Sequence, residues 1–194
     1  VDFLTVFDEA GTYGPETGSL VLEGNVVVRV EGVTLQNITV KGDLILAEGI
    51  GEGDAVLNNV TVEGNTYVRG GGAESIYING GAYSRIYVER TGGRVRVVVQ
   101  DASGAHVVLA ERELTEGEEV ILEGTFDSVV IAAPSAKVTL QGETTVKELT
   151  VEASALSATI SKTFTVTVDK AVLEVQTTFT GEGTIKEATG AGAE

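Results

Sequence analysis

The sequence predicts an all-β fold: a single right-handed parallel β-helix, or β-solenoid, of about nine coils of roughly 18–22 residues, with no significant helix. Three observations support this prediction. The 194 residues include 30 valines and 23 threonines, and β-branched side chains favour strands over helices. Apolar residues alternate with other residues along short segments. A degenerate repeat also recurs along the chain with a period of roughly 20 residues.

Short segments with a period of two follow one another from the N-terminus onward. Alternation of this kind is typical of strands that turn one face inward and one face outward. The segments include Val26, Val28 and Val30; Leu44 and Leu46; Val95, Val97 and Val99; Phe164, Val166 and Val168; and Val172 and Val175. No segment has a 3.6-residue apolar stripe bounded by helix caps. We therefore expect one domain over residues 1–194, with an N-terminal strand or edge segment at 1–20, coils at 21–187 and an Ala/Gly tail at 188–194.

The repeat distinguishes a solenoid from a β-sandwich. An apolar–any–Gly signature recurs at Leu22–Gly24, Val40–Gly42, Val62–Gly64, Ile78–Gly80, Leu122–Gly124 and Leu140–Gly142. Residues 33–42 match residues 55–64 at an offset of 22, with Asn37 over Asn59 and Thr39 over Thr61. A sandwich also fits short strands, but it needs hairpin turns and no such self-similarity. Stacked identical polar residues favour the solenoid, in which like positions lie above each other.

Composition excludes several classes of function. The formal charge of −16 repels phosphate backbones, so nucleic acid is not an expected partner. No apolar run reaches the length of a transmembrane segment. Cysteine is absent, which removes disulfides and thiolate chemistry. The single histidine, His106, lies beside Val107 and Val108, and we expect a surface or strand residue there rather than a catalytic base.

Several glycine-rich stretches together resemble a known group of proteins. They are residues 10–15, 46–54, 57–64, 69–78 and 93–99. This pattern resembles the right-handed parallel β-helix segments of secreted Gram-positive bacterial surface proteins, which often accompany S-layer homology modules and are similar in fold to pectate-lyase-like β-helices. The resemblance implies an extracellular setting and carries over no catalytic residue. No S-layer homology module is present in this sequence, so anchoring by that route is not supported.

One acidic loop is a candidate calcium site. Glu48, Glu52 and Asp54 lie within a glycine-rich segment, and Ca²⁺ takes several oxygen ligands in flexible geometry. The spacing matches neither an EF-hand loop nor a nonapeptide calcium repeat. The alternative is a solvated turn between coils, and we expect no other cofactor.

Tyrosines and arginines concentrate between residues 77 and 96. A sugar- or polyanion-binding face, a charged contact with a neighbouring subunit, and cross-strand pairing with local acids all fit this composition. The binding hypothesis predicts that Tyr77, Tyr83 and Tyr87 share one exposed side. The candidate face consists of Tyr77, Tyr83, Arg85, Tyr87, Arg94 and Arg96.

The ends of a solenoid carry unpaired backbone groups that another copy of the chain can meet. The segment Val1–Phe7 is an apolar strand, and the region near Phe164 and Phe179 has few charges. Both ends are candidates for head-to-tail assembly or for donation of the N-terminal strand. The alternative is that Phe3, Val6 and Phe7 fold onto their own first coil. The candidate interface residues are Val1, Phe3, Leu4, Val6, Phe7, Phe164, Val166 and Phe179.

These features predict a non-enzymatic structural subunit of an extracellular filament or surface layer, with itself as its main partner. No pair of Asp or Glu recurs on one strand face, as a glycosidase would need. The alternative is an extracellular module that binds carbohydrate or cell wall, and a degenerate polysaccharide lyase is less favoured. Other surface proteins and wall polysaccharide are further expected partners. The chain begins with Val rather than Met, which fits an exported protein whose signal peptide has been removed, and equally a cloned fragment.

Overall fold

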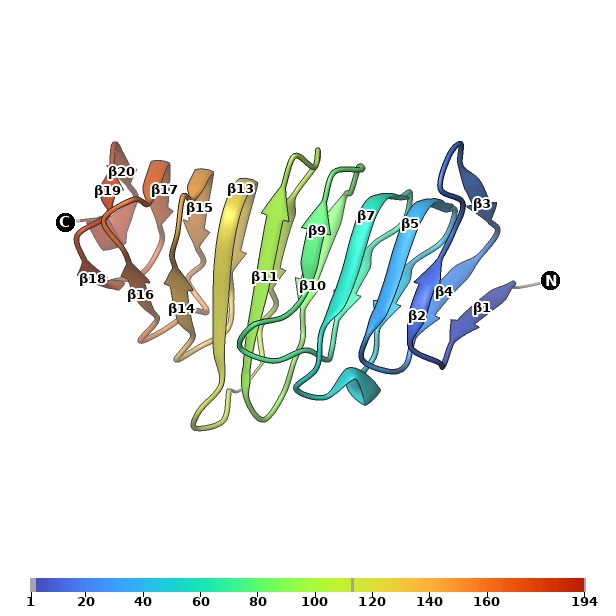
Figure 1. Cartoon of the computed structure of the whole chain (residues 1–194). Helices are drawn as coiled ribbons and strands as arrows, with labels where there is room; N and C mark the ends of the chain where they lie inside the picture. The colour runs from blue at the N-terminus through green and yellow to red at the C-terminus, as the bar shows by residue number, and fades with distance from the viewer. Residues whose placement is uncertain (1–2, 113, 194) are drawn as a thin grey trace.

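The computed structural model describes residues 3–112 and 114–193, and it is a parallel β-solenoid of about nine turns with 52% strand. The coils stack along one axis, with the first coil at one end and the last at the other (Figure 1). The helical content of the described residues is limited to two 3₁₀ turns, η1 (Glu48–Ile50) and η2 (Ala191–Ala193). The predicted fold class is confirmed.

Each coil contributes strands to two faces, which we call sheet A and sheet B. The strands of sheet A are β1 (Leu4–Phe7), β4 (Asn25–Val28), β6 (Leu44–Leu46), β8 (Thr66–Val68), β10 (Arg85–Val88), β12 (His106–Leu109), the second half of β13 (Glu119–Ile131), β15 (Thr145–Val151), β17 (Thr167–Leu173), β19 (Thr184–Ile185) and β20 (Ala188–Thr189). Long β13 runs through the corner and belongs to both sheets.

Sheet B forms the other face of the solenoid. Its strands are β2 (Gly11–Tyr13), β3 (Leu20–Leu22), β5 (Val33–Val40), β7 (Ala55–Val62), β9 (Tyr77–Asn79), β11 (Arg94–Gln100), the first half of β13, β14 (Lys137–Leu140), β16 (Thr159–Lys162) and β18 (Thr178–Gly181).

Parallel pairing arranges residues of successive coils in columns. The outward-facing column that runs through the middle of sheet A is Val6, Val27, Ile45, Tyr67, Tyr87, Val108, Val130, Thr150 and Val172. Each member lies one coil after the last, and the steps agree with the coil length that the repeat predicts. We call this set the outer column of sheet A.

The core lies between the two sheets and follows the alternation seen in the sequence. Strand β5 alternates buried and half-buried residues, except at Gln36 and Asn37, which are half-buried in succession. These two residues mark a bend at which the strand changes direction. Valine, leucine and isoleucine fill the inward columns, and residues such as Leu35, Leu57 and Ile78 are fully buried. Burial of these side chains in every coil is the main source of stability.

Asparagines stack at the bend of sheet B, as the repeat predicts. Asn37 and Asn59 both have a left-handed backbone, with φ of 51° and 52°, a region that asparagine tolerates better than most residues. Asn59 Nδ2 donates to Asn37 Oδ1 at 2.8 Å, and Asn37 Nδ2 donates to the Pro15 carbonyl at 2.8 Å. The predicted Thr39–Thr61 pair is also in register. This side-chain ladder ties the first coils together at a corner.

The glycines of the signature do not all occupy the same place in the coil. Gly24, Gly42 and Gly64 stack directly, with the Gly42 amide donating to Gly24 O and the Gly64 amide to Gly42 O. The sequence repeat aligned Gly80 with these three stacked glycines, and this alignment is wrong. Asn79 pairs with Asn58, which puts Gly80 beside the bend residue Asn59. A glycine serves there because φ at Gly80 is 68°.

A buried carboxylate joins two loops at the middle of the solenoid. Glu118 is 4% exposed and accepts hydrogen bonds from the amides of Gly92 and Thr115 at 2.6 and 2.9 Å and from Arg112 Nη1 at 3.1 Å. Burial by itself raises the pKa of a carboxyl. At Glu118 the two amides and the guanidinium outweigh burial and hold the pKa below its ordinary value.

Both ends of the chain pack on their own neighbours. Strand β1 pairs with β4, from Leu4 beside Asn25 to Phe7 beside Val28. The N-terminal strand is therefore already part of its own sheet, as the fold-back alternative predicts. At the other end, β20 pairs with β17, so residues 188 and 189 of the Ala/Gly tail lie on the last coil.

The bend ladder yields a stability prediction. Asn37→Ala removes the side-chain hydrogen bonds and also forces alanine into the left-handed region, so we expect a loss of about 2–3 kcal/mol in the free energy of unfolding. Asn37→Gly removes the bonds without the steric cost and is expected to lose less. Urea unfolding followed by circular dichroism measures both. Equal losses would show that backbone conformation at the bend contributes nothing.

The Glu118 network yields a pH-dependent prediction. Glu118→Gln replaces the charged acceptor, and we expect about 1–3 kcal/mol less stability near neutral pH. Because the folded pKa is lowered, this contribution is present above the unfolded pKa and is lost as pH falls through the folded pKa. The difference in the free energy of unfolding between the wild type and Glu118→Gln should therefore become smaller at acidic pH. Glu116→Gln, an exposed neighbour, is the matched control, and an equal effect there would contradict the prediction.

Candidate functional site

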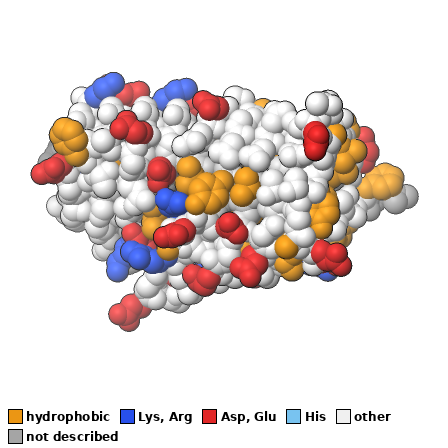
Figure 2. All heavy atoms as spheres, in the orientation of Figure 1, with side chains coloured by type: hydrophobic (Ala, Val, Ile, Leu, Met, Phe, Trp, Pro, Cys, Tyr) orange, Lys and Arg blue, Asp and Glu red, His pale blue; other side chains and the backbone are white. Residues whose placement is uncertain are grey.

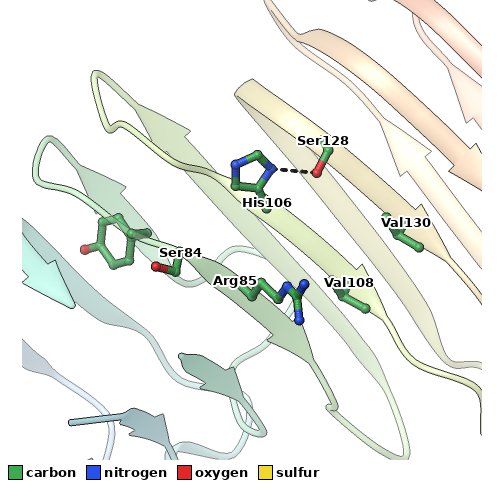
Figure 3. A pocket seen from close by; sticks show the side chains of 7 residues that line it. Ser84, Arg85, His106, Val108, Ser128 and Val130 are labelled. Carbon is green, nitrogen blue, oxygen red and sulfur yellow. Dashed lines mark hydrogen bonds between the residues drawn. The ribbon is translucent and has the colours of Figure 1, made fainter. Parts of the chain in front are cut away.

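An open hollow lies on the outer face of sheet A, over strands β10, β12 and β13. Its volume is about 470 Å³. The hollow is lined by Tyr83, Ser84, Arg85, His106, Val108, Ser128 and Val130 (Figure 3). Three successive coils therefore supply its surface, with apolar and polar side chains side by side.

The hollow arises from a change of side-chain size within the outer column of sheet A. Tyr67 and Tyr87 stack with ring centroids 5.3 Å apart and an angle of 12° between the rings. The next members of the column are Val108 and Val130, which are much shorter, so the surface is lower beyond Tyr87. Because Tyr67 covers one face of the Tyr87 ring, the opposite face is turned toward the coil of Val108. Half-buried Tyr87 is not itself a lining residue, but it is the neighbour of the lining residue Val108 in the outer column.

A polar row runs beside the outer column. Arg85 pairs with His106, and His106 pairs with Ser128 in the sheet register. His106 Nδ1 and Ser128 Oγ are 2.7 Å apart and share a hydrogen bond (Figure 3). Among the described residues no ion pair joins Arg85 to an acid. The row therefore presents hydrogen-bond donors and an unneutralised guanidinium to the hollow.

Two acids lie close to the polar row: Glu148, which pairs with Ser128 as the next member of the row, and Asp127, which precedes Ser128 in the chain. Asp127 Oδ1 accepts from Lys147 Nζ, and Asp127 Oδ2 accepts from the Gly104 amide. The hydrogen bond from Lys147 is the largest influence on this carboxyl and holds its pKa below the ordinary value, with a smaller contribution from His106. Asp127 does not line the hollow. Its charge is balanced by Lys147 rather than by Arg85.

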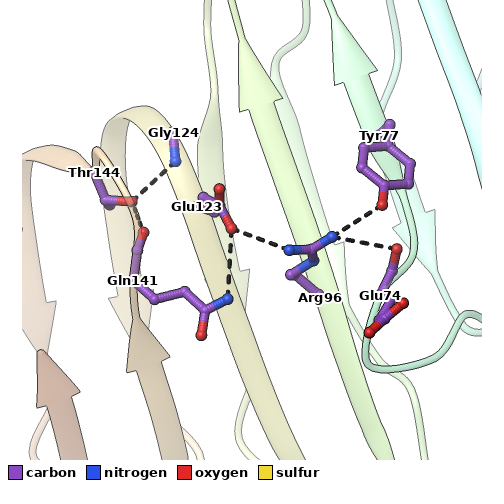
Figure 4. A network of polar contacts seen from close by, with 7 residues as sticks. All are labelled: Glu74, Tyr77, Arg96, Glu123, Gly124, Gln141 and Thr144. Atoms are coloured by element: carbon purple, nitrogen blue, oxygen red, sulfur yellow. Dashed lines mark hydrogen bonds and ion pairs between the residues drawn. The ribbon is translucent and has the colours of Figure 1, made fainter. Parts of the chain in front are cut away.

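The other predicted binding residues form a separate network on sheet B (Figure 4). Arg96 Nη2 donates to Tyr77 Oη at 2.9 Å, and Arg96 Nη1 lies 3.2 Å from Glu123. Arg94 pairs with Glu119 at 2.8 Å. These arginines are neutralised by acids on the next coil, which agrees with the cross-strand alternative.

The predicted single face of Tyr77, Tyr83 and Tyr87 is therefore wrong. Tyr77 lies on sheet B and Tyr87 on sheet A, while Tyr83 is 6% exposed and packs in the core beneath the hollow. Burial raises the pKa of the Tyr83 hydroxyl. The reason is spacing: a step of half a coil leads to the other sheet, whereas a step of one full coil returns to the same column.

That spacing also identifies residues that the sequence analysis missed. Tyr67 and Tyr87 are one coil apart, and so are His106 and Ser128. The first pair stacks its rings and the second shares a hydrogen bond. A search for polar and aromatic residues separated by one coil length, rather than for local clusters, would have paired them.

The calcium candidates are not brought together as ligands. Glu48 begins the short η1 turn, Glu52 pairs with Arg90, and Asp54 directly precedes β7. Glu52 and Asp54 line a second open hollow with Glu74, Ser75 and Tyr77. Within residues 3–112 and 114–193, no three acidic or histidine side chains are grouped as a metal ion requires.

The candidate interface residues divide into exposed and buried groups. Phe3, Leu4 and Phe164 are 60%, 58% and 78% exposed. Val6, Phe7 and Phe179 are half-buried, and the last two pack against the core. Val166 is fully buried, so its place in the predicted interface is wrong: it belongs to an inward column. Val1 lies outside the described residues.

Comparisons with known proteins are sparse. No family model matches the chain, and a search among curated proteins gave no match. A solved structure that matches is a chitinase from Paenibacillus sp. str. FPU-7, described as a cell-surface-expressed multi-modular enzyme machinery. The match has 55% sequence identity, a TM-score of 0.34, and covers 34% of this chain and 97% of that chain. A TM-score this low supports no argument about fold or function. In the part of the chain that the structure describes, no helix is long and apolar enough to span a bilayer.

Proposed function

We propose that this chain is a non-catalytic, extracellular carbohydrate-binding solenoid whose hollow on sheet A accepts a segment of a wall or matrix polysaccharide. The observation that carries this proposal is the open hollow itself, in which Val108 and Val130 lie beside hydrogen-bonding side chains, with Tyr87 next to Val108 in the outer column of sheet A. It is a narrower form of the binding hypothesis from the sequence. It keeps Arg85 and Tyr87 and replaces the residues of sheet B with His106 and Ser128.

The chemistry of the hollow suits a sugar. A pyranose ring has an apolar C–H face, which packs on the negative face of an aromatic ring, and hydroxyls around its rim. Val108 and Val130 in the lining supply apolar surface, and Tyr87 lies next to Val108 in the outer column. Hydrogen-bonding groups come from the other lining residues, Ser84, His106 and Ser128.

The same lining argues against hydrolysis. A glycosidase positions two carboxyl groups on either side of the scissile bond, and the seven lining residues include no Asp or Glu. The role we propose is therefore attachment rather than cleavage. The resemblance to β-helix segments of secreted Gram-positive surface proteins supports an extracellular setting, with wall polysaccharide or other surface proteins as partners.

A second candidate function is the structural subunit of a filament or surface layer. The observation that favours it is a cluster of exposed hydrophobic side chains on the first coil, namely Phe3, Leu4, Leu20 and Val21. Figure 2 shows hydrophobic side chains gathered at the N-terminal end of the solenoid. Strands β1, β2 and β3 each pair on one side only within the described residues. The occupant that fits is the last coil of a second copy, which would continue the parallel ladder and bury these side chains.

The binding proposal predicts a local loss of affinity. Tyr87→Ala removes the aromatic ring next to Val108, and we expect about 3- to 10-fold weaker binding to the polysaccharides that bind the wild type. Tyr77→Ala, on sheet B, is the matched control and should bind like the wild type. Affinity electrophoresis against a panel of wall and matrix polysaccharides measures both variants. Absence of binding by the wild type, or an equal loss in both variants, would refute the proposal.

The assembly candidate predicts a change of oligomeric state. Leu4→Asp with Val21→Asp places charges on the exposed end without disturbing the core, because both residues are exposed and pair with the outward-facing Asn25 and Thr39. We expect wild-type filaments in electron micrographs and monomers for the double variant. Phe7 is unsuitable for this test because it packs against the core. Dispersed wild-type monomers at every concentration, or polymers of the variant, would exclude this end as the joint.

A further inference from the structure

We propose that the hollow on sheet A selects an anionic glycan, and that Arg85 binds a carboxylate or phosphate group of the sugar while His106 and Ser128 donate hydrogen bonds to it. This inference rests on the proposed carbohydrate-binding function and adds the class of ligand. Its basis is the pairing of arginines with acids in a chain whose formal charge is −16.

Arg85 differs from the arginines around it. Arg69, Arg90, Arg94 and Arg96 each form an ion pair with a glutamate. Arg85 is exposed and has no such pair among the described residues. In an acidic protein, a guanidinium left without a carboxylate beside a hollow is available for a ligand anion, which it can bind in bidentate geometry.

The register explains why no acid reaches Arg85. Its partner on the next coil is His106, and the residue beside it on the preceding coil is Asn65, since Ile86 pairs with Thr66. Neither is acidic. The hollow itself has no acidic lining residue. Arg85 therefore has no carboxylate beside it on either adjacent coil, and the first acid after it in the row is Glu148, three coils further on.

His106 and Ser128 add donors to this site whichever tautomer the imidazole adopts. If Nδ1 accepts from the Ser128 hydroxyl, Nε2 carries a proton and donates. If Nδ1 donates to Ser128 Oγ, the serine hydroxyl hydrogen is free to donate. One donor of the pair thus remains for a ligand oxygen in either case.

The aromatic and cationic elements are spaced to contact one sugar unit. Arg85 and Tyr87 point outward from the same strand, two positions apart, which corresponds to about 6.6 Å along the strand. A ring packed against Tyr87 would then extend its charged substituent toward Arg85. Neutral polysaccharides would keep the ring contact and lose the ionic one.

The test uses polygalacturonate as the carboxylate probe and fully methyl-esterified polygalacturonate as its neutral counterpart, with wall teichoic acid as the phosphate probe. We expect the wild type to bind at least one anionic probe about tenfold more tightly than the ester. Whichever anionic probe binds identifies carboxylate or phosphate as the group. Arg85→Gln should remove this preference without changing affinity for the ester. Arg29→Gln removes the same charge from an exposed residue near the N-terminal end and is the matched control.

The outcomes separate this inference from the function on which it rests. Equal binding of charged and neutral probes, with loss in Tyr87→Ala, would overturn the anionic selectivity and leave the carbohydrate-binding proposal intact. If Arg85→Gln and Arg29→Gln weaken the binding of the anionic probes equally, the preference reflects general electrostatic attraction between protein and probe. That result would also overturn the assignment of Arg85. No binding of any polysaccharide by the folded wild type would refute both.

Discussion

The in-register parallel ladder is the constraint on which the rest of this structure depends. Each coil pairs its backbone with the next, so a side chain lies directly beside its counterpart one coil further along the chain. The asparagine stack, the buried valine columns and the tyrosine pair are all consequences of that register. Even the hollow follows from it, because it appears where the outer column of sheet A changes from tyrosine to valine.

The same constraint explains what the sequence allowed us to predict. Alternation and the match of residues 33–42 with residues 55–64 were sufficient for the fold class, the coil length and the stacking of Asn37 on Asn59. Coil length, however, is not constant along the chain, and each difference changes which outward residues meet. A local cluster such as Tyr77 to Arg96 therefore spreads over two sheets, whereas Tyr67 and Tyr87 become neighbours. Side-chain columns could be predicted only after every corner had been placed.

The ends show a different limit on prediction. Apolar alternation identifies Phe164, Val166 and Val168 as a strand pattern, but it does not say where the strand begins. Val166 and Val168 are buried and Phe164 is 78% exposed, since the strand β17 begins only at Thr167. At the N-terminus, Phe7 packs against the core and Leu4 does not. Aromatic content alone could not distinguish a side chain that completes the first coil from one left on its surface.

Charge in this solenoid is organised by the ladder as well. Lys41 with Glu63, Arg69 with Glu89 and Lys147 with Asp127 are separated by one coil length, so a cation is usually neutralised by the acid beside it on the adjacent coil. Exposed pairs of this kind add little stability, but together they leave few positive groups for a ligand. Arg85 lacks such a partner because both of its neighbours along the column, Asn65 and His106, are not acids. It lies in the lining of the hollow, where its charge faces the space that a ligand would occupy.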